Sequence, residues 1–124
     1  NNFNDQIYLR VADTYLLLAE AQFYLNDLAG AAATINLIRA RANATPITAS
    51  QVTLDFILDE RSRELWSEEH RRYTLLRTGT WFERTKKFNL IAGKVITQRD
   101  TIFPIPQVVI DANLSKTMSQ NPGW

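Results

Sequence analysis

The sequence predicts an all-α fold with a tetratricopeptide-like helical hairpin, further helices and an irregular, proline-containing C-terminal tail. Apolar residues recur at helical spacing in four stretches between residues 6 and 88. Residues 89–124 lack that spacing and hold three of the four prolines. A chain of 124 residues can bury one modest core, so we expect residues 1–124 to form a single domain.

The predicted hairpin consists of helices over residues 6–26 and 28–43, joined by the turn signal Asn26-Asp27. The first helix places five residues on one face, namely Tyr8, Ala12, Tyr15, Ala19 and Phe23. Leucines occupy its other faces, so we expect neighbours on most of its sides. A lone hairpin cannot bury both of its faces, and we therefore expect more chain on the N-terminal side.

Two further helices are predicted after Pro46. The third covers residues 53–69, with an apolar side formed by Leu54, Ile57, Leu58, Leu65 and Trp66. We expect Trp66 to lie in the core. The fourth covers residues 71–88 and is interrupted near Thr78-Gly79. A short strand is expected at 95–97, and the rest of the tail is expected to be extended.

Charge is distributed unevenly along a chain whose formal net charge is +1. Residues 1–70 hold ten acidic and five basic side chains, a net of −5, whereas residues 71–124 hold three acidic and nine basic ones, a net of +6. Such halves can attract each other or steer a partner. The absence of cysteine excludes a disulfide, a thiolate metal site and a cysteine nucleophile. The chain starts with Asn1-Asn2-Phe3 instead of Met, so we expect it to be a fragment or a processed product.

The densest charged segment covers residues 60–72. Arg61 falls between Leu58 and Leu65 on the apolar stripe of the third helix, so we expect a buried guanidinium that needs a carboxylate partner. Glu20 and Asp13, which lie within the apolar first helix, are the candidates. The favoured interpretation is a structural salt-bridge network that holds the third helix to the first.

Two functional interpretations of this segment are weaker. A glycosidase uses a pair of carboxylates as acid and base, but neighbours on one helix face do not face each other across a substrate. The surrounding arginines would also lower the carboxylate pKa values, which is the wrong direction for a general acid. His70 lies next to Glu68 and Glu69, yet consecutive residues do not converge on one metal ion. We expect neither a catalytic nor a metal site.

Residues 71–94 combine basic and aromatic side chains, a mixture that can hold single-stranded nucleic acid by charge and stacking. The alternative is an amphipathic helix whose basic face complements the acidic first half of the chain. We favour this alternative and expect no nucleic-acid partner.

Four blocks of the sequence resemble a known family. They are RVADTYLLLAEA (residues 10–21), NLIRARA (36–42), ILDERSRELWSEEHRRYTLLRTG (57–79), and the pair FPIPQ (103–107) with QNPGW (120–124). The chain is similar to the C-terminal region of the SusD/RagB family of outer-membrane nutrient-binding lipoproteins. The last two blocks are the most specific, and the resemblance covers nearly the whole chain.

The resemblance implies a protein without enzymatic activity or cofactor. Such a protein binds oligosaccharides, polysaccharides or other polymeric nutrients at the cell surface and delivers them to a TonB-dependent, SusC-like transporter barrel. It is anchored to the outer membrane by a lipid on a region absent from this chain. The alternative function is a tetratricopeptide-like module for protein–protein interaction.

The resemblance and the residue patterns together suggest roles for seven residues. We expect structural roles for Glu20, Arg61, Glu64, Phe103 and Pro104. Family ligands are held largely by variable loops and by other parts of the protein, so no sugar-contacting residue can be transferred. Trp81 and Arg99, which lie near predicted loops, are the candidate ligand contacts.

Overall fold

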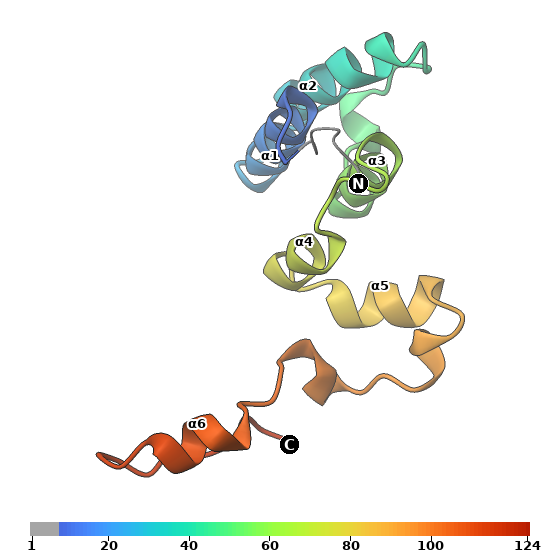
Figure 1. Cartoon of the computed structure of the whole chain (residues 1–124). Helices are drawn as coiled ribbons and strands as arrows, with labels where there is room; N and C mark the ends of the chain where they lie inside the picture. Colours follow the sequence, from blue (N-terminus) through green and yellow to red (C-terminus); the bar gives the residue numbers. More distant parts are fainter. Residues whose placement is uncertain (1–7) are drawn as a thin grey trace, which may run out of the picture. The chain divides into compact units, whose positions relative to one another are not determined.

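The computed structural model describes residues 8–124, and within them it contains six α-helices and no strand (Figure 1). The helices are α1 (Val11–Tyr24), α2 (Leu28–Arg41), α3 (Leu54–Glu64), α4 (Arg71–Arg77), α5 (Trp81–Phe88) and α6 (Gln107–Ala112). Three short 3-10 helices lie between them, namely η1 (Ala49–Gln51), η2 (Ala92–Lys94) and η3 (Gln98–Thr101). The prediction of an all-α fold is confirmed. The chain divides into two compact units, Asn1–Glu69 and His70–Trp124.

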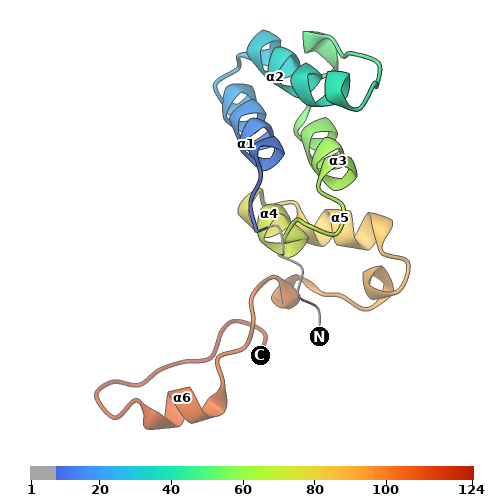
Figure 2. The same cartoon turned by 45° about the horizontal axis from the view of Figure 1, so that its top comes forward.

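In the first unit α1 and α2 pack against each other as a hairpin (Figure 2). The chain reverses between them because Asn26 adopts the left-handed conformation, with φ of 61°. Asp27 then caps α2 by accepting a hydrogen bond of 2.8 Å from the backbone N–H of Gly30. A side chain at Gly30 would overlap the Asp27 carboxylate, so a larger residue here would displace the capping side chain.

The core of the first unit is built from small and aliphatic residues of the three helices and of the connection between α2 and α3. Its two clusters are Ala19, Ala31, Ala32, Ile35, Ile47, Val52 and Ile57, and Ala12, Leu16, Ile38 and Leu65. The predicted face of α1 is only partly right, because Ala12 and Ala19 are buried whereas Tyr8 and Tyr15 are exposed. Leu17 and Leu18 are also exposed, so the neighbours expected on most sides of α1 are not found among the described residues.

Helix α3 begins where predicted but ends five residues early. Thr53 caps its start by accepting a hydrogen bond of 3.0 Å from the N–H of Phe56. After Glu64 the chain leaves the helix, and Ser67 adopts a left-handed conformation with φ of 68°. The prediction that Trp66 belongs to the core is wrong, because its side chain is 80% exposed. Trp66 follows the last helical turn, so the helical stripe no longer determines its direction.

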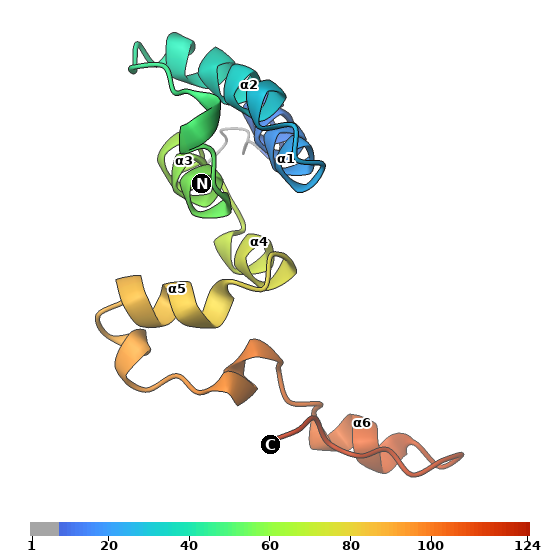
Figure 3. The same ribbon diagram turned by 180° about the vertical axis from the view of Figure 1, so that it is seen from behind.

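The second unit begins with two short helices, α4 and α5. The predicted interruption near Gly79 is confirmed, and Gly79 itself has φ of +69°, a conformation that favours glycine. Helix η2 folds back against the end of α5, as Figure 3 shows. The strand expected at 95–97 is absent, because the N–H groups of Val95 and Ile96 both donate to the carbonyl of Ala92 and so are used within a local turn.

Helix α6 was not expected from the sequence. It is six residues long and begins directly after Pro106, a residue that can precede a helix because it needs no intrahelical partner for its nitrogen. Val108 and Val109 are exposed, so the helix has no buried stripe that could have produced a helical pattern in the sequence. No helix in residues 8–124 is both long enough and apolar enough to cross a membrane.

Candidate functional site

Arg61 of α3 is the centre of a charged cluster in the first unit. Its side chain is buried, at 3% exposure, and its guanidinium pairs with Asp13 of α1. Its Nε also donates to Glu69 over 2.6 Å. A buried guanidinium is tolerated only when carboxylates compensate for the lost hydration, and here two do so. The predicted burial of Arg61 is confirmed, and Asp13 is one of the two candidate partners, Asp13 and Glu20, that the sequence suggested.

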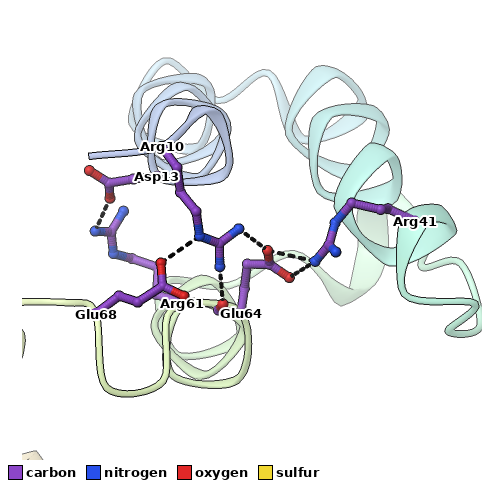
Figure 4. A network of polar contacts seen from close by, with 6 residues as sticks. All are labelled: Arg10, Asp13, Arg41, Arg61, Glu64 and Glu68. Carbon is purple, nitrogen blue, oxygen red and sulfur yellow. Dashed lines mark hydrogen bonds and ion pairs between the residues drawn. The ribbon is translucent and has the colours of Figure 1, made fainter. Parts of the chain in front are cut away.

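Glu64 and Arg10 form a second part of the cluster (Figure 4). Arg10 directly precedes α1 and reaches Glu64 over 2.6 Å and Glu68 over 2.5 Å. Its Nη2 also donates to the backbone carbonyl of Glu64. These hydrogen bonds, first to Glu68 and then to Glu64, raise the pKa of Arg10 above its ordinary value. Arg41, at the end of α2, pairs with the same Glu64 carboxylate over 2.6 Å.

The turn after α3 supplies two of the carboxylates. The N–H groups of Glu68 and Glu69 each donate to the carbonyl of Leu65 over 3.0 Å, so the chain curls back toward α3. This turn places Glu68 beside Arg10 and Glu69 beside Arg61. The cluster consequently connects α1, α2, α3 and the turn that follows α3.

A third group lies on α3 one turn before Glu64. The buried carboxylate of Glu60 accepts from Arg39 of α2 over 2.9 Å and from Arg63 over 2.5 Å. Both guanidinium groups lie 5.7 Å from the centre of the Phe56 ring. Each of the five arginines of residues 8–69 therefore pairs with a carboxylate of the same unit.

This arrangement is suited to holding helices together and not to chemistry. Every carboxylate described above is bound to at least one arginine, so its oxygens are occupied by contacts within the unit. Among residues 8–124 no group of three or more His, Cys, Asp and Glu side chains could hold a metal ion. Glu20, the other candidate partner of Arg61, is buried in α1.

In the second unit Arg72 of α4 lies between two aromatic rings. Its guanidinium carbon is 4.4 Å from the centre of the Trp81 ring and 4.5 Å from that of Phe103. Its Nη2 donates to the carbonyl of Asp100 over 2.8 Å. Trp81, a candidate ligand contact, is thus only 9% exposed and has Arg72 against its ring. The stack connects the start of the FPIPQ block to α4 and α5.

The FPIPQ and QNPGW blocks bind each other through side-chain amides. The Gln120 side-chain amide accepts from the backbone N–H of Ile105 and donates to the backbone carbonyl of Ile105, both over 2.8 Å. These two hydrogen bonds have the same pattern as those exchanged by two paired residues in a β-sheet. Asn121 donates to the carbonyl of Phe103 over 2.7 Å. We call this contact the tail clasp. Pro104 lies within it and is exposed.

Arg99 and Trp124 continue the tail clasp at the surface. The guanidinium carbon of Arg99 lies 4.6 Å from the centre of the Trp124 ring, and its Nη1 donates to the carbonyl of Gly123. The indole N–H of Trp124 donates to the carbonyls of Arg99 and Ile102 over 3.3 and 3.1 Å. Half of the Arg99 side chain remains exposed. Unlike Trp81, this pair is accessible from the surface of its unit.

Sequence reasoning missed Arg10 and Arg41 as members of the charged cluster. A signal for them was present, because a hairpin brings the residue before its first helix close to the end of its second helix. The Arg72 stack and the tail clasp were also missed. They join positions 9 to 31 residues apart, and no periodic pattern marks such contacts.

Comparison with known proteins identifies the family to which the chain is similar. The family model described as "SusD family" matches residues 1–124. The chain is 42% identical over 85 residues to the SusD-like protein P25 of Formosa agariphila, an alignment covering 64% of this chain and 16% of that protein. It is 35% identical over 121 residues to the starch-binding protein SusD of Bacteroides thetaiotaomicron, covering 93% of this chain and 21% of that protein. No solved structure is significantly similar to the chain.

Proposed function

Because the chain belongs to the SusD family, we propose that it is part of a surface protein that binds glycans, or other polymeric nutrients, for delivery to a transporter. Members of this family are non-catalytic binding proteins. The observation that supports the proposal most is the family match over all of residues 1–124. The starch-binding name of one relative agrees with a glycan as the ligand class.

Our proposal for residues 1–124 is a scaffold role within one domain at the C-terminal end of that protein. The charged cluster supports it, because Arg61 and Glu64 fix α1, α2 and α3 to one another. Phe103 and Pro104 belong to the tail clasp and Glu20 is buried in α1, so structural roles fit all five motif residues. The short connection and close packing of α1 and α2 support a tetratricopeptide-like hairpin.

The proposed partner is a TonB-dependent, SusC-like barrel in the outer membrane. The protein would lie on the cell surface and carry its lipid anchor on a region outside residues 1–124. The partner and the location are proposed from the family, because the chain spans 16% and 21% of the length of the two curated relatives it matches.

For the ligand contacts we propose Arg99, together with Trp124, ahead of Trp81. Sugar rings bind to aromatic faces flanked by hydrogen-bond donors, and Arg99 and Trp124 supply both at an accessible position. The Trp81 ring is buried and has Arg72 against it, so little of its surface is accessible to a ligand.

Retardation of the full-length protein in gels containing different polysaccharides tests this proposal. We expect at least one glycan to retard the protein, and Arg99→Ala to weaken that retardation. Trp66→Ala is the matched control, because Trp66 is an exposed aromatic residue outside the tail clasp. If no glycan retarded the protein and the protein cleaved no glycan, glycans would be contradicted as the ligand class.

The alternative, a tetratricopeptide-like module for protein–protein interaction, is favoured by one observation. Several large apolar residues of α1 and α2 are exposed, as in a face that receives a peptide or a helix. Binding of a separate protein to this face, with no binding to any glycan, would support the alternative.

A further inference from the structure

The two units use their basic residues differently. In the first unit each arginine among residues 8–69 pairs with a carboxylate of the same unit. The second unit, His70–Trp124, holds nine lysine and arginine residues against three aspartate and glutamate residues, which gives a net charge of +6 with His70 neutral. Three carboxylates cannot neutralise nine cations, so the second unit carries an uncompensated positive charge.

Three exposed lysines of this unit lie close together along the backbone at the end of α5. Lys86 and Lys87 occupy the last turn of α5, and η2 folds back against the helix (Figure 3). Gly93 of η2 lies directly against Lys86, because a Cβ added at Gly93 would be 2.6 Å from the Lys86 carbonyl oxygen. The next residue is Lys94, so the fold brings it beside the other two. We call Lys86, Lys87 and Lys94 the lysine patch.

The lysine patch has no carboxylate partner among residues 8–124. The Nζ of Lys86 lies 5.4 Å from the centre of the Phe82 ring, and that of Lys87 lies 4.9 Å from the centre of the Phe88 ring. The Lys94 side chain makes no ion pair or hydrogen bond within the described part of the chain. An ammonium group without a carboxylate is costly to bury, so these three groups belong at the surface of the protein.

The carboxylates of the second unit are engaged elsewhere or stand apart from the lysines. Asp100 accepts hydrogen bonds from the N–H and the hydroxyl of Thr97 over 2.7 and 3.0 Å. Asp111 accepts from Gln107 over 2.7 Å. Glu83 lies in the first turn of α5 and forms no ion pair with a lysine of residues 8–124. The lysine patch is thus open to a negatively charged ligand.

Arg99, one of the proposed ligand contacts, supplies a fourth cation. Its Nε lies 3.7 Å from Asp100 and its Nη1 donates to the carbonyl of Gly123 over 3.2 Å, whereas its Nη2 has no hydrogen-bond partner among residues 8–124. The half-exposed guanidinium therefore has N–H groups left for a ligand beside the Trp124 ring. Both η2 and η3, which contains Arg99, pack on α5, so Arg99 and the lysine patch lie on neighbouring elements.

These four cations favour a ligand with repeated negative charges. A neutral sugar needs an aromatic face and hydrogen-bonding groups but gains nothing from net charge. A polyanion interacts with several cations at once, and carboxylate or sulfate oxygens accept charge-assisted hydrogen bonds from guanidinium and ammonium groups.

Nucleic acid fits the same surface less well. Binding of single strands depends on open aromatic faces on which bases stack. In the basic and aromatic segment 71–94, Trp81 is only 9% exposed and has Arg72 against its ring. The segment therefore offers charge without the series of open rings that bases require.

We infer that the ligand is an anionic polysaccharide, one that carries carboxylate or sulfate groups, and that the lysine patch and Arg99 bind these groups. The inference rests on the proposed glycan-binding function and adds the charge of the glycan. The Trp124 ring contacts the sugar, and the cations select for its acidic substituents.

Binding of the full-length protein to matched pairs of immobilised polysaccharides tests the inference. Each pair shares one backbone and differs in charge, namely polygalacturonate with its methyl ester and dextran sulfate with dextran. At low salt the charged member of at least one pair should bind at least about tenfold more tightly, a difference that several exposed ion pairs together supply. Added salt should remove the difference, because the Debye length shortens from about 30 Å at 0.01 M to about 3 Å at 1 M.

Charge reversal separates the lysine patch from the overall charge of the protein. Lys94→Glu should weaken binding to the preferred charged glycan by at least about fivefold. Lys94 makes no side-chain ion pair or hydrogen bond in residues 8–124, so the change leaves the described packing intact. Lys116→Glu is the matched control, because Lys116 is an exposed lysine of the same unit that follows α6 and makes the same change in net charge. We expect it to weaken binding by less than about twofold.

Several results would overturn the inference. They are equal or tighter binding of the neutral member in both pairs, equal losses in Lys94→Glu and Lys116→Glu, and a single-stranded oligonucleotide that binds the same residues as tightly as the charged glycan. Lys94-dependent binding to phosphatidylglycerol vesicles but to neither charged glycan would assign the patch to lipid instead.

The inference and the proposed function fail in different ways. Retardation by neutral glycans, without a preference for either charged polymer, would leave the proposed function intact and contradict the anionic ligand. Binding to no polysaccharide, charged or neutral, would contradict the proposed function, and the inference with it.

Discussion

Arg61 of α3 and Asp13 of α1 form a buried ion pair between residues 48 positions apart in the chain. The contact joins two of the sequence blocks that the chain shares with the SusD family. Arg61 also holds Glu69, so the pair fixes the turn after α3 as well as the packing of α3 on α1. The other arginines of the first unit extend the same arrangement to α2.

Replacing Arg61 should destabilise the full-length protein strongly. Arg61→Leu leaves Asp13 and Glu69 without their buried partner, and breaking a pair of this kind costs about 3–5 kcal/mol. Denaturant unfolding measures the loss. The matched control is Arg63→Leu, because Arg63 is also an arginine of α3 in an ion pair but is largely exposed. We expect about 1 kcal/mol or less for the control. Equal losses for the two variants would contradict a buried, structural Arg61.

Removing the Gln120 amide should open the tail clasp locally. Gln120→Ala deletes both hydrogen bonds to Ile105, each contributing about 0.5–1.5 kcal/mol. Hydrogen exchange of the Ile105 amide in the full-length protein should accelerate by about tenfold. Gln107→Ala is the control, because the Gln107 side chain donates to the exposed Asp111 in the same helix and is not part of the tail clasp. An unchanged exchange rate in Gln120→Ala would show that the clasp does not hold Ile105.

A side chain at Gly123 should disturb the Arg99–Trp124 pair. Gly123 has φ of +87°, which costs a residue with a side chain about 1–2 kcal/mol, and its new Cβ would lie 2.9 Å from that of Arg99. Gly79→Ala is the control. Gly79 also has a positive φ, but a Cβ added there would have no atom within 4 Å, so this variant introduces the backbone strain without a clash. Gly123→Ala should therefore increase the solvent exposure of Trp124, measured by acrylamide quenching, whereas Gly79→Ala should not. Identical quenching in both variants would contradict the packing described for the pair.

Asp100 should titrate below its usual pKa of 3.8. A hydrogen bond from the backbone N–H of Thr97 is the main cause, and the Thr97 hydroxyl and the charges of Arg99 and Arg72 add to it. A lowered pKa in the folded state means that the carboxylate stabilises the η3 turn above pH 3.8 and that this contribution is lost as the pH falls through the lower value. The Thr97 amide chemical shift, followed by NMR against pH, should report that midpoint. A midpoint at or above 3.8 would contradict the contact, and Asp100→Asn should abolish the transition.

The sequence predicted the elements that depend on periodic burial. The hairpin, the third helix and the break at Gly79 follow from apolar spacing and turn residues, and so does the burial of Arg61 between Leu58 and Leu65. Family membership was predicted from four motif blocks and is confirmed. Placement of the blocks at the C-terminal end of a longer protein stays a prediction.

Features that depend on contacts between distant residues were not predictable in this way. Trp66 follows an apolar helix but lies beyond its last turn, where the chain direction is set by Ser67 and not by periodicity. The partners of Glu64 come from two other segments, and the stack of Arg72 on Trp81 and Phe103 forms only after the tail has folded back. The candidate ligand contact Trp81 is predicted from its position near a loop, and that position does not reveal that Arg72 lies against its ring.

The most direct test of the proposed function is the purification of the tagged, full-length protein from detergent-solubilised membranes of its native cell. We expect a large outer-membrane barrel to be recovered with it in near-equal amount, because a surface binding protein that serves a transporter would remain bound to it. Recovery of the protein in the soluble cytosolic fraction, or together with nucleic acid and without a barrel, would show that it does not serve a transporter.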